Sequence, residues 1–156
     1  MSADLIRGWM PGSSPGMTVF GMLRMARREI LPPSLADLET LATEALRTIP
    51  EVLRQHVRDV IIQVQEFPDE ETEREMELET PFDLLGLYRG VDLTRQSVSD
   101  VRTSPDMIFL YRRPLLDYWC DSGEDLAHIV RHVMIHEIGH HFGFSDEDME
   151  ALEEQQ

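Results

Sequence analysis

The sequence has one cysteine, no lysine, no asparagine and no long apolar run. A lone Cys120 cannot form an internal disulfide, and no succession of basic, apolar and small residues typical of a secretory signal opens the chain, so we expect a reducing cytoplasm. A membrane helix needs roughly 18 consecutive apolar residues, so we also expect no membrane partner.

Positive charge is scarce. The sequence has 14 basic residues, all arginine, and 30 acidic ones, so the net charge is -16. Such a chain repels phosphate backbones, so we expect no nucleic-acid partner. The length of 156 residues suits one domain. Because glycine and proline crowd residues 1–33, we predict a flexible N-terminal extension there and a folded domain over 34–156.

The patterning of the remaining chain mixes helices and short strands. Ser34 with Asp37 forms a capping-box pattern that starts a helix over 35–48, and a further turn or two follows Pro50. Strands are predicted at three places: 60–67, 84–94 and 107–116. The sequence therefore predicts an α+β domain with a small three- to four-stranded sheet.

Two further segments complete this reading. Eight acidic residues lie between positions 66 and 79, and such density favours a solvated, solubilising loop. A helix is predicted over 123–142, ended by Gly143 in a left-handed conformation. A short last helix then follows Ser145, with Asp148 at the capping position.

The stretch HEIGHHFGFSD, residues 136–146, has a residue order that indicates chemistry at a metal ion rather than core packing. His136 and His140 are four residues apart and leave one helix face together, close enough to bind one ion. Glu137 is turned about 100° around the helix, beside such an ion, where a general base would act on zinc-activated water. Catalytic zinc usually has three protein ligands and an open position.

Asp146 is the best third ligand. It follows the bend at Gly143, so its carboxylate can approach from another direction, and the whole pattern is HExxHxxGxxD. The alternative is that Asp146 only belongs to the first turn of a capped helix, with Glu147 or Asp148 as substitute ligands.

Other polar residues have less specific readings. His128 and His132 are expected in the core or at its rim, with His132 a candidate to support a ligand; His141 is expected at the surface, and His56 in a structural role. Four residues are candidates to stabilise an oxyanion: Tyr88, Tyr111, Arg112 and Tyr118.

HEIGHHFGFSD, with the upstream LLGLYRG and FLYRRPL, resembles the small bacterial zincin-like metallopeptidase family over about residues 34 to 152. The resemblance implies a minimal zincin-like fold, with a small sheet, a backing helix and an active-site helix. It also implies Zn²⁺ held by His136, His140 and Asp146, with Glu137 as the base. It implies no particular substrate.

The leading hypothesis is a zinc-dependent hydrolase that cuts peptide bonds, with a peptide or protein substrate added to a sheet edge near 107–112. The alternative is a zinc-stabilised protein-binding module with little or no catalysis. A metal-dependent endoribonuclease of the H-x3-H-x5-H type is disfavoured by Asp at position 146 and by the net charge. The sequence does not fix the oligomeric state.

Overall fold

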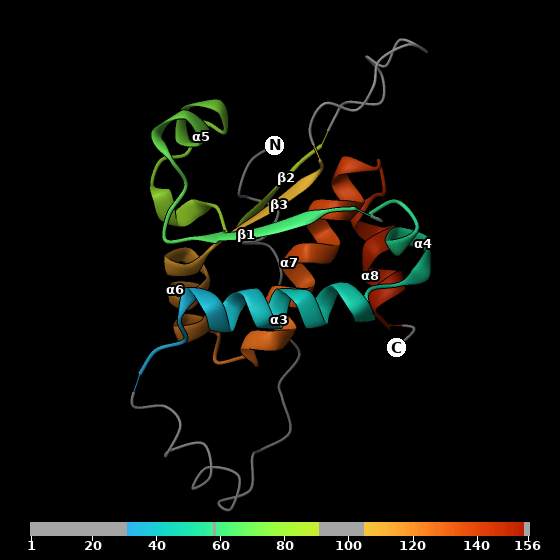
Figure 1. Ribbon diagram of the computed structural model, residues 1–156, viewed down its shortest axis with the longest axis horizontal. Coiled ribbons are helices and arrows are strands. Elements are labelled where there is room, and N and C mark those ends of the chain that lie inside the picture. Colours follow the sequence, from blue (N-terminus) through green and yellow to red (C-terminus); the bar gives the residue numbers. More distant parts are fainter. Residues whose placement is uncertain (1–30, 58, 91–104, 155–156) are drawn as a thin grey trace, which may run out of the picture.

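The structure is a computed structural model that describes residues 31–57, 59–90 and 105–154 (Figure 1). Most of the predicted N-terminal extension, the second part of the strand predicted at 84–94 and nearly all of the following loop lie outside these residues. Among the described residues, no helix is long and apolar enough to cross a membrane.

The elements alternate between helices and short strands. In chain order they are α3 (Leu35–Thr48), α4 (Glu51–Arg54), β1 (Ile61–Gln65), α5 (Glu70–Glu75), the 3₁₀ helix η1 (Pro81–Asp83), β2 (Gly86–Arg89), β3 (Met107–Tyr111), α6 (Arg112–Ser122), α7 (Leu126–His141) and α8 (Asp146–Glu154).

The described strands form one mixed sheet of three strands in the order β1-β3-β2. β1 runs parallel to β3, and β2 runs antiparallel to it. Ile62, Ile108 and Tyr88 align across the three strands, and paired residues share a face of the sheet. The predicted α+β class with a small sheet is confirmed.

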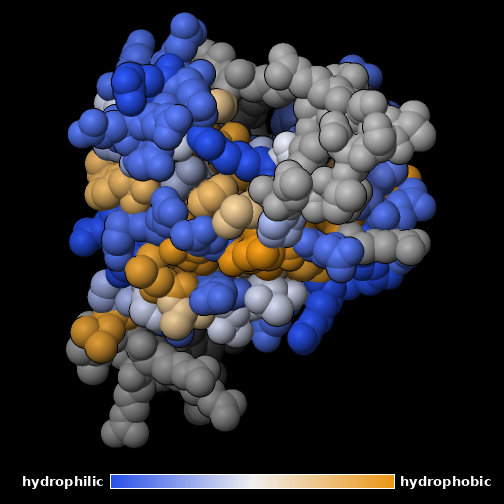
Figure 2. All heavy atoms as spheres, turned by 45° about the horizontal axis from the view of Figure 1, so that its top comes forward, coloured by the Kyte–Doolittle hydropathy of each residue, from blue (hydrophilic) through white to orange (hydrophobic). Residues whose placement is uncertain are grey.

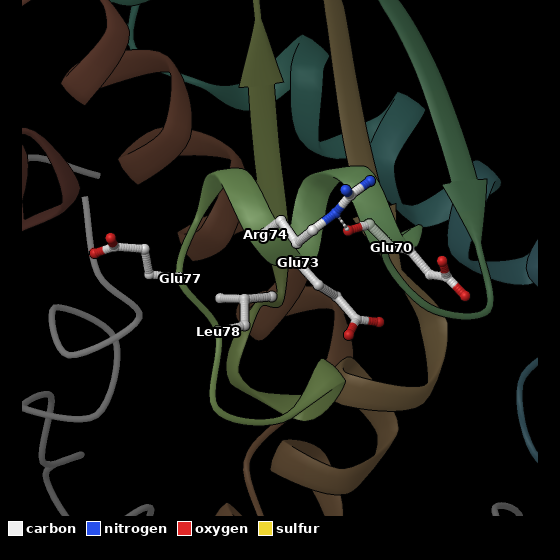
Figure 3. A pocket seen from close by; sticks show the side chains of 5 residues that line it. All are labelled: Glu70, Glu73, Arg74, Glu77 and Leu78. Carbon is white, nitrogen blue, oxygen red and sulfur yellow. Dashed lines mark hydrogen bonds between the residues drawn. The ribbon is translucent and has the colours of Figure 1, made fainter.

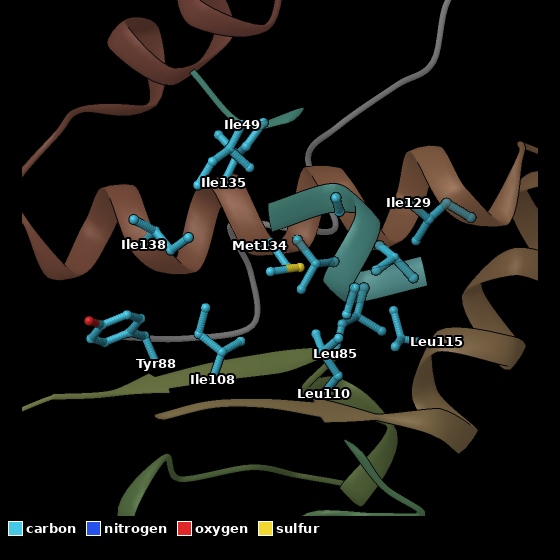
Figure 4. Close-up of a cluster of buried hydrophobic side chains, with 14 of the residues drawn as sticks. Ile49, Leu85, Tyr88, Ile108, Leu110, Leu115, Ile129, Met134, Ile135 and Ile138 are labelled. Carbon is cyan, nitrogen blue, oxygen red and sulfur yellow. The ribbon is translucent and has the colours of Figure 1, made fainter. Parts of the chain in front are cut away.

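Helices α3 and α7 pack against one face of this sheet and against each other (Figure 1). Their apolar side chains and those of the inner sheet face make the core, where Ile108, Leu110, Met134 and Ile135 are fully buried (Figure 4). The predicted backing helix is α3, and it has the predicted bounds because its capping box forms. The side chains of Ser34 and Asp37 each accept a hydrogen bond from the other residue's backbone N–H.

The strand predicted over 107–116 is too long. β3 ends at Tyr111, and α6 starts at once with Arg112. Pro114 is the third residue of that helix, within the first turn, whose N–H groups have no partner inside the helix, so it does not interrupt the hydrogen bonding. The apolar residues on both sides of Arg112 and Arg113 hid the change from strand to helix.

The acidic segment is more ordered than predicted. Residues 70–75 form α5, because Asp69 caps it by accepting from the N–H of Thr72 and acids in the first turn favour the helix dipole. Hydrophilic side chains gather around α5, at the upper left of Figure 2. The segment is exposed, as expected, but it is not a plain loop.

Two further expectations about position are wrong. The helix predicted from Gly123 begins at Leu126, capped by Asp125, while Gly123 ends α6 with φ 68°. Strand β3, proposed as the peptide-binding edge, lies in the middle of the sheet, so both of its sides are already paired. The edge strands among the described residues are β1 and β2.

Candidate metal centre

The motif histidines lie on α7, and α8 follows them after a bend. Gly143 has φ 83°, the left-handed conformation predicted to end the helix. The last turn closes through Phe144, whose N–H donates to the carbonyl of Gly139 at 2.9 Å. The chain then reverses, so that α8 packs against α7.

This bend brings three predicted ligands together. One ligand atom from each of His136, His140 and Asp146 lies within 4.8 Å of the others. Nε2 of His140 is 3.3 Å from Oδ1 of Asp146. Among the described residues, Nε2 of both histidines and Oδ1 of Asp146 are buried without a hydrogen-bond partner. Buried polar atoms left unpaired in this way are costly unless something else binds them.

The donor set fits zinc. Two imidazole nitrogens and one carboxylate oxygen are usual ligands of a catalytic zinc ion and leave a fourth position open. Burial, reinforced by the nearby His132, lowers the pKa of His136 to about 4. His136 is therefore neutral near pH 7 and offers a lone pair, as a ligand must.

Asp146 is not consumed by helix capping. The capping box at the start of α8 uses Ser145 and Asp148 instead: Oδ2 of Asp148 accepts from the N–H and hydroxyl of Ser145, and Ser145 Oγ accepts from the N–H of Asp148. Asp146 is the first residue of α8, as the alternative expected, while the capping bonds are made by Asp148, the residue predicted for them. The Asp146 side chain is 46% exposed, yet its Oδ1 is turned into the histidine pair.

Glu137 faces the sheet. Its Oε2 accepts from the backbone N–H of Tyr88 in β2 at 3.3 Å. Surrounding protein atoms desolvate this carboxylate and raise its pKa to about 7, although the Tyr88 bond acts in the opposite direction. The close approach of α7 to β2 depends on Gly86, since a Cβ there would lie 2.8 Å from Val133.

Among the described residues, β2 has no strand partner on the side away from β3, and Glu137 lies on that side. Leu85 accepts from the N–H of Tyr111, which places the odd-numbered residues of this segment in hydrogen bonds with β3. The N–H of Tyr88 therefore points away from β3, toward Glu137. An edge strand with outward backbone groups is a template for an extended peptide.

The structure separates the oxyanion candidates. Arg112 is 9% exposed and is bound to Glu66 and the carbonyl of Pro33, and Tyr111, the last residue of β3, is 1% exposed. Tyr118 lies on α6. Tyr88 lies on β2, the strand that packs against the motif helix: its hydroxyl donates to Asp106 and its ring lies 4.2 Å from that of His141.

The remaining histidines differ in part from expectation. His132 is buried, and its Nδ1 lies 3.0 Å from Oε2 of Glu153. His141 is half-buried against Tyr88 rather than at the open surface, while the ring of His56 stacks on Phe142 at 4.7 Å. Sequence reasoning missed Glu153, whose only signal was its spacing of seven residues from Asp146.

Two other features lie outside this centre. A pocket on the acidic segment is lined by Glu70, Glu73, Arg74, Glu77 and Leu78, none of them from the motif (Figure 3). Cys120 is a free, exposed thiol on α6. Among the described residues it is not part of a cluster of side chains that could hold a metal ion.

A small mixed sheet, a backing helix and an HExxH helix beside an edge strand define a zincin-like metallopeptidase fold. A family model of zincin-like metallopeptidases matches residues 57–156, more than half of the chain. The protein belongs to this family. The match begins after α3, later than the resemblance read from the sequence. No curated protein shows a significant match to the chain.

A matched pair of cap variants tests whether the start of α8 positions Asp146. Ser145→Ala and Ser34→Ala each remove a capping box, so each is expected to cost about 1 kcal/mol of unfolding free energy, measured in urea. Only Ser145→Ala is expected to weaken zinc binding, by up to about fivefold, because only that cap adjoins Asp146. Equal zinc affinities for the two variants would contradict this role.

Proposed function

We propose that the protein is a zinc-dependent peptidase of the cytoplasm, with His136, His140 and Asp146 as metal ligands and Glu137 as general base. One observation carries the proposal: three buried ligand atoms from an HExxH helix and the following helix converge without hydrogen-bond partners among the described residues. Membership of the zincin-like metallopeptidase family supports it.

The protein's own residues have separate roles in the proposed reaction. Zinc, when bound, supplies a Lewis acid and lowers the pKa of water to about 7. Glu137 accepts the proton of the attacking water and delivers it to the departing amine. The N–H of Tyr88 holds the Glu137 carboxylate in place. The edge of β2 away from β3, through backbone groups other than the N–H of Tyr88, pairs with the backbone of an extended peptide, which suits an unfolded or flexible substrate segment.

The test is a peptide-library digest followed by mass spectrometry. Zinc-loaded protein is expected to produce cleavage products, and chelation is expected to reduce them at least about tenfold, with recovery when zinc is returned. Asp146→Asn should lose cleavage, whereas the matched variant Glu147→Gln, at the adjacent exposed acid, should retain it. Zinc-loaded protein that cleaves no peptide would favour a zinc-stabilised binding module instead.

A further inference from the structure

A second group of metal-binding side chains adjoins the first. One ligand atom from each of His132, His136 and Glu153 lies within 4.8 Å of the others. His132 is 4% exposed, His136 is 7% exposed, and the Glu153 side chain is 16% exposed. Buried histidines around a largely buried carboxylate are a metal-type donor set, and they differ from the exposed acid clusters found on many surfaces.

Helix geometry repeats the first group one turn along. His132 and His136 have the same four-residue spacing as His136 and His140, so all three rings lie along one side of α7. Their ring centroids are 4.1 and 5.8 Å apart. Asp146 and Glu153 are seven residues apart, about two turns, and so share one face of α8. The antiparallel pair of helices thus presents a carboxylate at each end of the histidine row.

The two groups differ in how their atoms are satisfied. The first group's ligand atoms have no hydrogen-bond partner among the described residues. In the second, Nδ1 of His132 lies 3.0 and 3.1 Å from the two carboxylate oxygens of Glu153. A cation entering the second group must replace that bond, so it binds more weakly there than in the first.

His136 belongs to both groups. A neutral imidazole has one nitrogen lone pair, so His136 can serve one ion at a time. The two positions are therefore alternatives, because an ion bound by His136 at one of them excludes His136 from the other.

We propose that His132, His136 and Glu153 form an alternate position for a divalent transition metal, adjacent to the HExxHxxGxxD position and exclusive with it. An ion held there is not bound by His140 or Asp146. This position does not depend on peptide cleavage, because it concerns metal binding alone.

The experiment is a binding cycle on the full chain, stripped of metal and titrated with Zn²⁺ and Co²⁺ by calorimetry and absorption spectroscopy. Wild type is expected to bind one ion. Asp146→Asn is expected to bind one ion at least about tenfold more weakly, with a changed Co²⁺ spectrum. Adding Glu153→Gln to this variant should weaken its residual ion binding at least about tenfold further. The same substitution in the wild-type background should change ion affinity by less than about threefold.

Two controls keep the cycle decisive. Asparagine retains an oxygen that can still ligate, so His140→Ala provides a second way to disable the first position. Glu150→Gln makes the same charge change as Glu153→Gln at an exposed position of α8. It should leave ion affinity unchanged both in wild type and in the variants whose first position is disabled. Circular dichroism establishes that each variant is folded.

The outcomes separate the two proposals. Folded Asp146→Asn and His140→Ala variants that bind no ion, or whose binding ignores Glu153→Gln, would overturn the alternate position and leave the proposed peptidase intact. Wild type that binds neither Zn²⁺ nor Co²⁺ would overturn both.

Discussion

Replacing Glu137 by glutamine is expected to lower peptide cleavage by about 10²- to 10⁴-fold while zinc binding stays within about threefold of wild type. The amide is nearly the size of the carboxylate, and its oxygen can still accept from the N–H of Tyr88. It cannot take a proton from water at neutral pH. The loss should therefore appear in kcat, with KM for the peptide nearly unchanged.

The measurement is the initial rate of cleavage of a peptide identified in the library digest, with zinc content determined on the same samples. Glu150→Gln, which removes one charge from exposed α8, is the matched control and should keep the wild-type rate. A Glu137→Gln variant that binds zinc and cleaves at the wild-type rate would remove Glu137 from the mechanism.

The helices that carry the site were predictable because their signals are local. The spacing of His136 and His140 sets a shared helix face whatever surrounds it, and Gly143 ends α7 by its own backbone preference. The capping box of Ser34 and Asp37 likewise fixes the start of α3 within one turn. Asp146 was predicted as the third ligand by the same local reasoning, because the bend at Gly143 lets the following residues approach the histidines from another direction.

Features that depend on packing between distant segments were not predictable. Apolar residues continue from β3 into α6 on both sides of Arg112 and Arg113, so the sequence pattern does not show that the strand ends at Tyr111. Helix α6 packs against α7 and η1, and these contacts between distant segments are not contained in the pattern. The order β1-β3-β2 places the last strand in the middle, which single-strand patterns do not encode. The contact of Glu153 with His132 requires α8 to return along α7, a direction visible only in the fold.

The return of α8 depends on a close contact between Gly139 and Met149. Met149 is fully buried, and a Cβ on Gly139 would lie 2.1 Å from its Sδ and 2.9 Å from its Cγ. Gly139 immediately precedes the ligand His140, and Met149 lies one turn after Asp146. The absence of a side chain at position 139 therefore lets α8 approach closely enough for Asp146 to meet the histidines.

Gly139→Ala is accordingly expected to destabilise the protein by about 1–3 kcal/mol through overpacking, even though alanine favours helices by about 1 kcal/mol over glycine. Zinc affinity should fall by at least about tenfold, because the displaced α8 carries Asp146 with it. Urea unfolding of the metal-free protein and zinc titration measure the two effects separately.

Combination with Met149→Ala distinguishes a steric cause from a general loss of stability. Met149→Ala alone leaves a cavity and is expected to cost about 2–5 kcal/mol. In the double variant the methyl group added at position 139 occupies part of that cavity, so the combined cost should be smaller than the sum by about 0.5–3 kcal/mol. Strictly additive costs would mean that the two residues do not compete for one space, and that some other contact holds α8 against α7.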